Sequence, residues 1–124
     1  MKDEDLGAFR NHARLEGGIR TAVKAWCADG DEAKDQYGPI ASWNTSEITN
    51  MEWLFDDETD FNEDISRWEV SKATTMFCMF VGATSFDQQL GGAWARSTAF
   101  KKFMFDRSAG SIVGKTNDVY GTPR

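Results

Sequence analysis

The feature that most constrains the fold is an internal repeat with a period of 25 residues. Residues 40–64 read IASWNTSEITNMEWLFDDETDFNED, residues 65–89 read ISRWEVSKATTMFCMFVGATSFDQQ, and the two segments align without a gap. The matched positions hold mostly apolar or hydroxyl side chains: Ile40/Ile65, Trp43/Trp68, Ser46/Ser71, Thr49/Thr74, Met51/Met76, Leu54/Met79, Phe55/Phe80, Thr59/Thr84 and Phe61/Phe86. A chain that repeats its packing residues in this way predicts a stack of similar coils.

A third copy follows at residues 90–114, with the sequence LGGAWARSTAFKKFMFDRSAGSIVG, and it keeps only part of the pattern. Three apolar positions stay in register: Leu90, Met104 and Phe105. The Trp moves by one position to Trp94, and Lys101 replaces the Met. Terminal repeats commonly diverge, because one of their faces meets no further repeat. We therefore predict a degraded third repeat over residues 90–105 and a loose C-terminal tail over residues 106–124.

The repeated positions also predict the secondary structure of each copy. Met76, Met79 and Phe80 stand at i, i+3 and i+4, the spacing that places three side chains on one face of a helix. Upstream, Trp68 and Val70 alternate with polar residues, which is typical of a short strand. Each copy is therefore expected to form a strand, a turn and a short helix.

The segment before the repeats predicts a helical N-terminal cap over residues 1–39. An early helix is suggested by Leu6, Phe9 and Ala13. A second, amphipathic helix that ends near Gly30 is indicated by Ile19, Ala22, Val23 and Trp26. A third helix over about residues 31–37 would end at Gly38, which is followed by a proline. The repeats then occupy residues 40–105, and the cap is expected to complete their core because two good copies are few for a stable stack.

The residues shared by the copies form the unit I-S-x-W-x-V-S-x-x-T-x-M-x-x-M-F, followed by F-[ND]-x-x. In the second copy the unit is carried by Ile65, Ser66, Trp68, Val70, Ser71, Thr74, Met76, Met79, Phe80, Phe86 and Asp87. This unit resembles the repeat of the BspA-like leucine-rich-repeat surface proteins, also described from mycoplasma-type lipoproteins. The resemblance implies an α/β fold, namely a short leucine-rich-repeat-like solenoid of about 25-residue strand-turn-helix coils with a helical cap. It also implies a role at the cell surface or in adhesion.

Composition argues against two classes of partner. Twenty acidic residues against fourteen basic ones give a net charge of −6, and the basic residues do not cluster, so no nucleic acid is expected as a partner. No apolar run approaches the roughly 18 residues that a membrane span needs. The N-terminal sequence carries neither the apolar region of a secretory signal nor a lipidation cysteine, so a cell-surface location is expected from the resemblance alone.

The chain offers little material for metal or redox chemistry. Its two cysteines, Cys27 and Cys78, match no zinc spacing, and His12 is the single histidine. We expect two buried free thiols, with one disulfide as the open alternative. No cofactor, metal ligand set or catalytic residue is predicted, because no nucleophile and base or carboxylate pair stands at a readable spacing.

Residues 109–116, AGSIVGKT, match a relaxed phosphate-binding loop in which Ala109 replaces the first glycine. Such a loop needs a following helix whose N-terminus faces the phosphates. Only eight residues follow Thr116, and they include Gly121 and Pro123, so there is no room for that helix. A nucleotide-binding enzyme is therefore the least favoured hypothesis, and the chain is not expected to be an enzyme.

The acidic run FDDETDFNED, residues 55–64, invites a comparison with calcium loops. In the EF-hand pattern Phe61 would occupy the glycine position and Arg67 the distal glutamate position, so the run is not an EF-hand. The corresponding turn of the next copy, VGATSFDQQ, has lost nearly all the acids. A solvated acidic turn is favoured, and an irregular calcium site stays open as the alternative.

Aromatic residues at the repeat period are expected to stack inside the fold rather than to form an exposed row. The predicted repeat core comprises Ile40, Trp43, Met51, Leu54, Phe55, Phe61, Ile65, Trp68, Val70, Met76, Met79, Phe80 and Phe86. With the Trp residues inside, alternation along the strands turns four candidate binding residues outward: Ser42, Asn44, Arg67 and Glu69. These four define a predicted binding face for a protein or a glycan. The alternative is a structural fragment or decayed member of a longer array that has no ligand of its own.

Two positions differ between otherwise similar copies. Phe77 and Cys78 stand where the preceding copy has Glu52 and Trp53. We predict that they contact the degraded third repeat, through Phe100 or Phe103.

Overall fold

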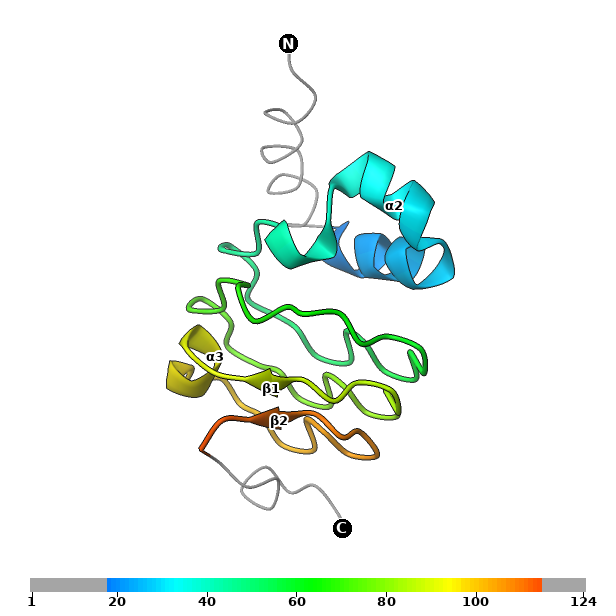
Figure 1. Ribbon diagram of the computed structural model, residues 1–124. Coiled ribbons are helices and arrows are strands. Elements are labelled where there is room, and N and C mark those ends of the chain that lie inside the picture. Colours follow the sequence, from blue (N-terminus) through cyan, green and yellow to red (C-terminus); the bar gives the residue numbers. More distant parts are fainter. Residues whose placement is uncertain (1–17, 115–124) are drawn as a thin grey trace.

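The computed structural model describes residues 18–114 of the 124-residue chain. Helices form a layer at one end (blue and cyan in Figure 1), and the described residues that follow them wind in successive loops beneath. The elements in chain order are a helix over residues 18–28, α2 (Gly30–Tyr37), the 3-10 helix η1 (Ile40–Ser42), β1 (Gln89–Leu90), α3 (Ala93–Arg96) and β2 (Ser111–Ile112). We call the helix of residues 18–28 together with α2 the helical layer. The first, second and third coils are residues 40–64, 65–89 and 90–114.

The helix α2 forms because both of its ends are capped. Asp29 Oδ1 accepts a hydrogen bond from the Glu32 backbone N–H at 3.2 Å, which satisfies a donor that the first helical turn leaves unpaired. At the other end Gly38 has φ 81°, and its N–H donates to the Lys34 carbonyl at 2.8 Å. Both helices predicted for this region are confirmed. The earlier predicted helix lies outside the described residues, as do Leu6, Phe9 and Ala13.

Successive coils are joined by backbone hydrogen bonds between residues 24 positions apart, as in the bond from the Trp53 N–H to the Phe77 carbonyl. Four N–H groups of the first coil donate to the second coil at 2.7–3.1 Å: those of Met51, Trp53, Phe55 and Asp57. Four N–H groups of the second coil donate to the third coil over the same distances: those of Met76, Cys78, Phe80 and Gly82. Further round the coil the parallel strands β1 and β2 pair, with Leu90 opposite Ile112. The repeat therefore sets a repeated backbone register.

The short helices predicted from the Met and Phe spacing are not formed. Residues 52–57, 77–82 and 102–107 make consecutive turns instead. The reason is a left-handed backbone conformation at every fourth residue, which an α-helix cannot contain: Trp53 (φ 61°), Asp57 (φ 57°), Cys78 (φ 57°), Gly82 (φ 75°), Phe103 (φ 58°) and Arg107 (φ 58°). In the first and second coils every second N–H of these turns bonds to the next coil, whereas a helix would keep it inside the segment.

The strand predicted around Trp68 is also absent, because this part of the coil is closed by local turns. The Trp68 N–H donates to the Ile65 carbonyl at 3.1 Å, and the Ala73 N–H donates to the Val70 carbonyl at 3.1 Å. Within residues 18–114, the only strands are the two-residue segments β1 and β2. The alternation of buried and exposed side chains survives without a strand, since Trp68 and Val70 are buried and Glu69 is exposed.

The core consists of aromatic columns that run from coil to coil. Phe80 stacks between Phe55 and Phe105, with ring centroids 5.3 and 5.4 Å apart and ring planes within 3° of parallel. Trp68 stacks between Trp43 and Trp94 at 6.3 and 6.4 Å. The buried indole N–H of each Trp reaches a backbone carbonyl, which removes the cost of burying an unpaired donor. All residues of the predicted core are at most 5% exposed.

The third coil keeps the architecture despite its divergent sequence. Lys101 stands at the Met position, is 8% exposed, and its ammonium donates to the Ser97 and Ala99 carbonyls at 2.6 and 3.2 Å. These carbonyls supply the polar partners that a buried lysine requires. The ordered chain also extends past the predicted end of this coil at residue 105. The segment expected to begin a loose tail instead contains β2, whose Ile112 is 1% exposed.

Candidate functional site

The four predicted binding residues, Ser42, Asn44, Arg67 and Glu69, are all exposed. In three of them the polar side-chain atoms form hydrogen bonds within local turns. Ser42 Oγ donates to the carbonyl three residues back at 3.1 Å. The side chains of Asn44 and Glu69 each accept the backbone N–H two residues further on, at 3.1 and 3.3 Å. Such bonds shape turns, so these groups are engaged within the coil.

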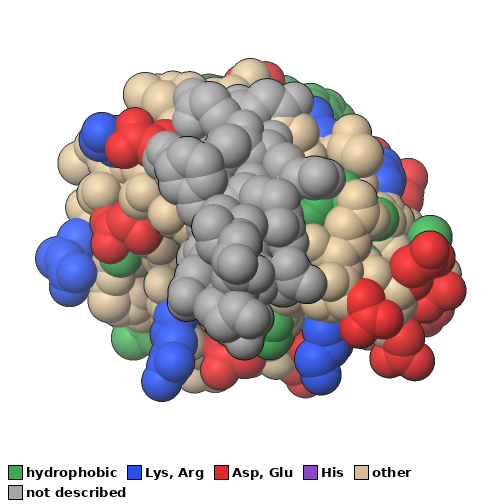
Figure 2. All heavy atoms as spheres, turned by 90° about the horizontal axis from the view of Figure 1, so that it is seen from above, with side chains coloured by type: hydrophobic (Ala, Val, Ile, Leu, Met, Phe, Trp, Pro, Cys, Tyr) green, Lys and Arg blue, Asp and Glu red, His purple; other side chains and the backbone are tan. Residues whose placement is uncertain are grey.

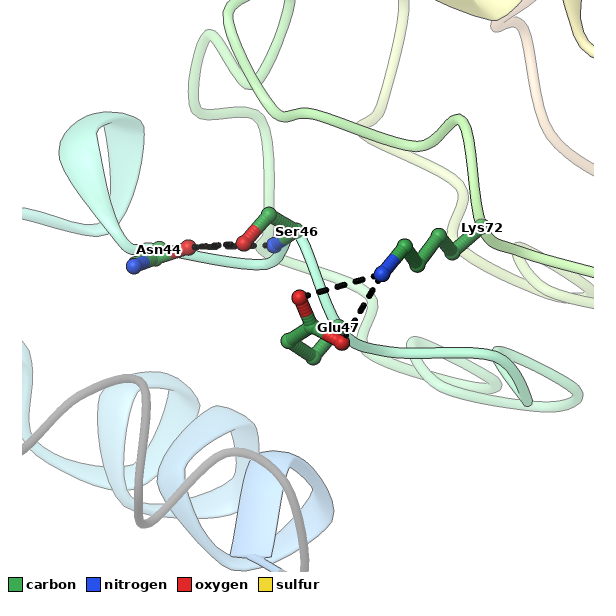
Figure 3. A network of polar contacts seen from close by, with 4 residues as sticks. All are labelled: Asn44, Ser46, Glu47 and Lys72. Atoms are coloured by element: carbon green, nitrogen blue, oxygen red, sulfur yellow. Dashed lines mark hydrogen bonds and ion pairs between the residues drawn. The ribbon is translucent and has the colours of Figure 1, made fainter.

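The same face carries a charge pair between coils (Figure 3). Lys72 Nζ lies 3.1 and 3.2 Å from the two carboxylate oxygens of Glu47, beside the Asn44–Ser46 turn. The side chains of Lys72 and Glu47 are 58% and 40% exposed, so the pair contributes about 0–1 kcal/mol. The predicted binding face is thus polar, and most of its polar groups bond to neighbouring groups of the same face.

A different face carries a row of aromatic side chains, which we call the aromatic ridge: Trp53, Phe77, Phe100 and Phe103. Phe100 is 55% exposed and Trp53 is 45% exposed. The Phe77 ring centroid lies 5.8 Å from those of Trp53 and Phe100 and 6.4 Å from that of Phe103. The predicted contact between Phe77 and the third coil is confirmed, through both Phe100 and Phe103. One apolar strip therefore crosses all three coils at the surface.

The sequence contains a signal for this ridge at positions that the copies do not share. Equivalent positions at one end of the turn hold Asn50, Thr75 and Phe100, so the apolar side chain is not a repeated core residue. A large apolar residue at a position where the other copies are polar points outward, because the other copies already show that this position faces water.

A second surface feature is a cleft of about 540 Å³ between the helical layer and the first coil. Three partly or fully buried side chains contribute its apolar lining: Trp26, Ile40 and Phe61. Five carboxylate residues line it as well: Asp31, Asp57, Glu58, Asp60 and Glu63. Seen from above, acidic side chains gather at the right of the molecule, the side on which α2 lies in Figure 1 (Figure 2). Four acids of the run, Asp57, Glu58, Asp60 and Glu63, therefore line the cleft, and all of them except Glu58 are also exposed to solvent, as expected for a solvated turn.

The cleft is held by an ion pair and contains a cysteine. Lys24 Nζ lies 2.9 Å from Glu58 Oε2, and this hydrogen bond raises the pKa of Lys24. Cys27 is half-buried, and burial together with the adjacent Glu58 carboxylate raises the pKa of its thiol to about 12. Burial also raises the pKa of Cys78. Both cysteines are free, so the disulfide alternative is not formed, and both are protonated at neutral pH.

Other candidate sites lack the geometry that their chemistry needs. Within residues 18–114, no three His, Cys, Asp or Glu side chains converge to hold a metal ion. Ser111 and Ile112, in the middle of the phosphate-loop-like motif, form β2 rather than a loop. Lys115, Thr116 and His12 lie outside the described residues. None of the helices within the described part of the chain is long and apolar enough to cross a membrane.

Comparison with known proteins gives one finding. Residues 30–114 match a family described as "Mycoplasma protein of unknown function, DUF285". The matched segment begins with α2 and ends with the third coil, so it contains both the aromatic ridge and most of the cleft. No curated protein and no solved structure matches the chain.

Proposed function

The chain belongs to the DUF285 family of mycoplasma-type proteins of unknown function, and from this premise we propose that it is a non-catalytic repeat module that binds another protein through its aromatic ridge. The observation that carries the proposal is the exposed row of rings across three coils, with Phe100 55% and Trp53 45% exposed. Aromatic residues are enriched at the energetic centres of protein interfaces. A location at the cell surface would accord with the resemblance to BspA-like proteins.

The proposal includes a leucine-rich-repeat-like solenoid as the scaffold. It is supported by the eight hydrogen bonds between coils that share a 24-residue offset and by the aromatic columns of the core. Solenoids present extended surfaces on which each coil contributes one part of a binding strip. The ridge has this property, because Trp53 comes from the first coil, Phe77 from the second and Phe100 from the third.

The geometry of the rings favours a protein partner over a glycan. Phe77 and Phe100 stack face to face, with ring planes 17° apart, so part of their ring faces is covered. Sugars on protein surfaces stack against open ring faces, whereas apolar side chains of a protein also pack well against ring edges. Lys102 lies beside the ridge with its ammonium 5.2 Å from the Phe103 ring centroid. An apolar centre with a charged rim matches the anatomy of protein interfaces.

The test is to probe the purified chain and a ridge variant, Trp53→Asn with Phe100→Thr, on peptide and glycan arrays. Asn tolerates the positive φ at position 53, and Thr copies the equivalent Thr75 of the second coil, so the variant should fold. Arg67→Ala serves as the matched control on the predicted binding face. We expect peptides with apolar side chains to bind the wild-type chain and the control, and to lose binding to the ridge variant.

Three outcomes would count against the proposal. Binding to glycans alone would assign the ridge to sugars. Loss of binding in Arg67→Ala but not in the ridge variant would assign binding to the predicted binding face instead of the ridge. Binding to neither array would favour the alternative of a structural unit without a ligand of its own.

A further inference from the structure

We propose that the cleft between the helical layer and the first coil binds an organic cation, namely an ammonium or guanidinium group on an alkyl chain. The site is separate from the aromatic ridge and does not depend on the function proposed above. Its volume of about 540 Å³ lies within the range of ordinary small-ligand sites, roughly 300–1,000 Å³.

The lining has the two kinds of surface that such a ligand needs. The side chains of Trp26, Pro39 and Ala41, none of which is fully buried, provide apolar surface against which an alkyl stem packs. Five carboxylates and one ammonium group, that of Lys34, also line the cleft, which leaves a clear excess of negative charge. A cleft with charges of one sign raises the local concentration of the opposite ion. The half-buried Trp26 adds a ring that attracts a cation over its face.

The second coil acts as an internal control for these carboxylates. It makes the same turn and the same hydrogen-bond pattern as the first coil, yet it carries no acid at the four equivalent positions. The pairs are Asp57/Gly82, Glu58/Ala83, Asp60/Ser85 and Glu63/Gln88. The coil therefore folds without acids there, so folding of the turn does not explain why the first coil has them. Within residues 18–114, Glu58 is the one of these four acids that forms an ion pair, with Lys24.

The arrangement distinguishes an organic cation from a metal ion. Calcium and magnesium need several oxygen atoms that converge on one point. In the described part of the chain no three acidic, His or Cys side chains converge in this way. Carboxylates distributed around an apolar cleft suit a larger cation with delocalised or shielded charge, which contacts one or two of them while its stem covers the apolar lining.

The experiment titrates the purified chain with arginine amide and, as the matched neutral ligand, citrulline amide. Binding is followed by amide chemical shifts of residues 57–63 and of α2. The variant Asp60→Asn with Glu63→Gln removes two exposed carboxylates of the cleft. The control is Asp87→Asn, an exposed carboxylate outside the cleft that is replaced by the residue found at the equivalent Asn62. A peptide arm, acetyl-Gly-Arg-Gly-amide, distinguishes a partner's side chain from a free amine as the source of the cation.

We expect arginine amide to shift these resonances and citrulline amide not to. The cleft variant should weaken arginine amide binding about threefold or more, and added salt should weaken it further, while Asp87→Asn changes nothing. Tighter binding of the peptide than of arginine amide would identify the cation as a side chain, and equal or weaker binding would identify it as a small amine. Equal responses to arginine and citrulline amides, or equal binding by the cleft variant and wild type, would overturn the proposal. So would the absence of any shift.

Discussion

Two rows of packed aromatic rings cross the coils of this protein, and they differ in what covers them. The inner row, Phe55, Phe80 and Phe105, has centroid spacings of 5.3 and 5.4 Å and is fully buried. The outer row includes Trp53 and Phe100, spaced at 5.8 Å from Phe77, and both are about half exposed. The ring centroids are spaced nearly alike in the two rows, so the distance between rings does not separate them. Burial separates the rows, because folding removes the inner row completely from water and the outer row only in part. The inner row therefore gains more stability from the burial of apolar area.

The largest effect should follow from truncation of the inner row at its centre. Phe80→Ala removes a ring that contacts Phe55, Phe86 and Phe105, and it should lower the free energy of unfolding by about 3–5 kcal/mol. Phe77→Ala should cost clearly less, because that ring lies in the partly exposed ridge. Urea denaturation of both variants measures the difference. Equal losses would mean that the two rows are energetically equivalent.

A smaller effect should follow at the turn between the two rows. A Cβ on Gly82 would stand 2.2 Å from Asp57 Oδ1, so Gly82→Ala must displace that carboxylate. Asp57 is exposed and its carboxylate can move aside, so the larger cost is the positive φ of 75°, in which an alanine is strained. We expect a loss of about 1–2 kcal/mol, measured by urea denaturation. Most of it should remain in the Asp57→Gly background, and a loss that disappears there would assign the cost to the carboxylate.

The outer row should contribute least to stability. Trp53→Asn and Phe100→Thr should each change the unfolding free energy by about 1 kcal/mol or less, since the side chains are half exposed and Asn suits the left-handed backbone at position 53. Thermal unfolding monitored by circular dichroism measures the change. A loss as large as that of Phe80→Ala would show that the ridge belongs to the core.

Ionisation of Cys27 in the cleft should leave the free energy of unfolding unchanged at neutral pH and should lower it in alkali. Because the pKa of Cys27 is about 12 in the folded chain and its ordinary value is near 9, the unfolded chain ionises first. Stability from this group is complete below about pH 9 and is lost as the pH rises towards 12. Unfolding at a series of pH values, compared with Cys27→Ala, measures the effect. An identical pH dependence in both chains would contradict the assignment. Alkylation of Cys27 at pH 8 should also be slow, and faster in Glu58→Gln.

How far the sequence predicts the structure differs between the two rows. Inward positions follow from the repeat, because each copy must pack the same face on its neighbour. The local backbone at these positions does not follow from the repeat. Turns closed by bonds such as that from the Met79 N–H to the Met76 carbonyl place apolar residues three positions apart, as a helix does. The ridge depends on left-handed backbone at Trp53 and Phe103, which no periodicity reports for non-glycine residues.

The cleft could not be predicted from local pattern either, for a different reason. It brings residues near Trp26 and Ile40 together with the acidic turn of the first coil, and only the packing of the helical layer on that coil makes this neighbourhood. The acidic turn itself stood out in the sequence, because the next copy lacks its charges. The sequence pattern does not show which residues form the opposite side of the cleft.

We propose that the outer aromatic row serves binding and that the inner row serves folding. The most direct test measures peptide binding and the melting temperature of one variant, Trp53→Asn with Phe100→Thr, beside wild type. We expect a melting temperature well above that of Phe80→Ala, together with loss of peptide binding. Retained binding would contradict it, and so would a melting temperature as low as that of Phe80→Ala.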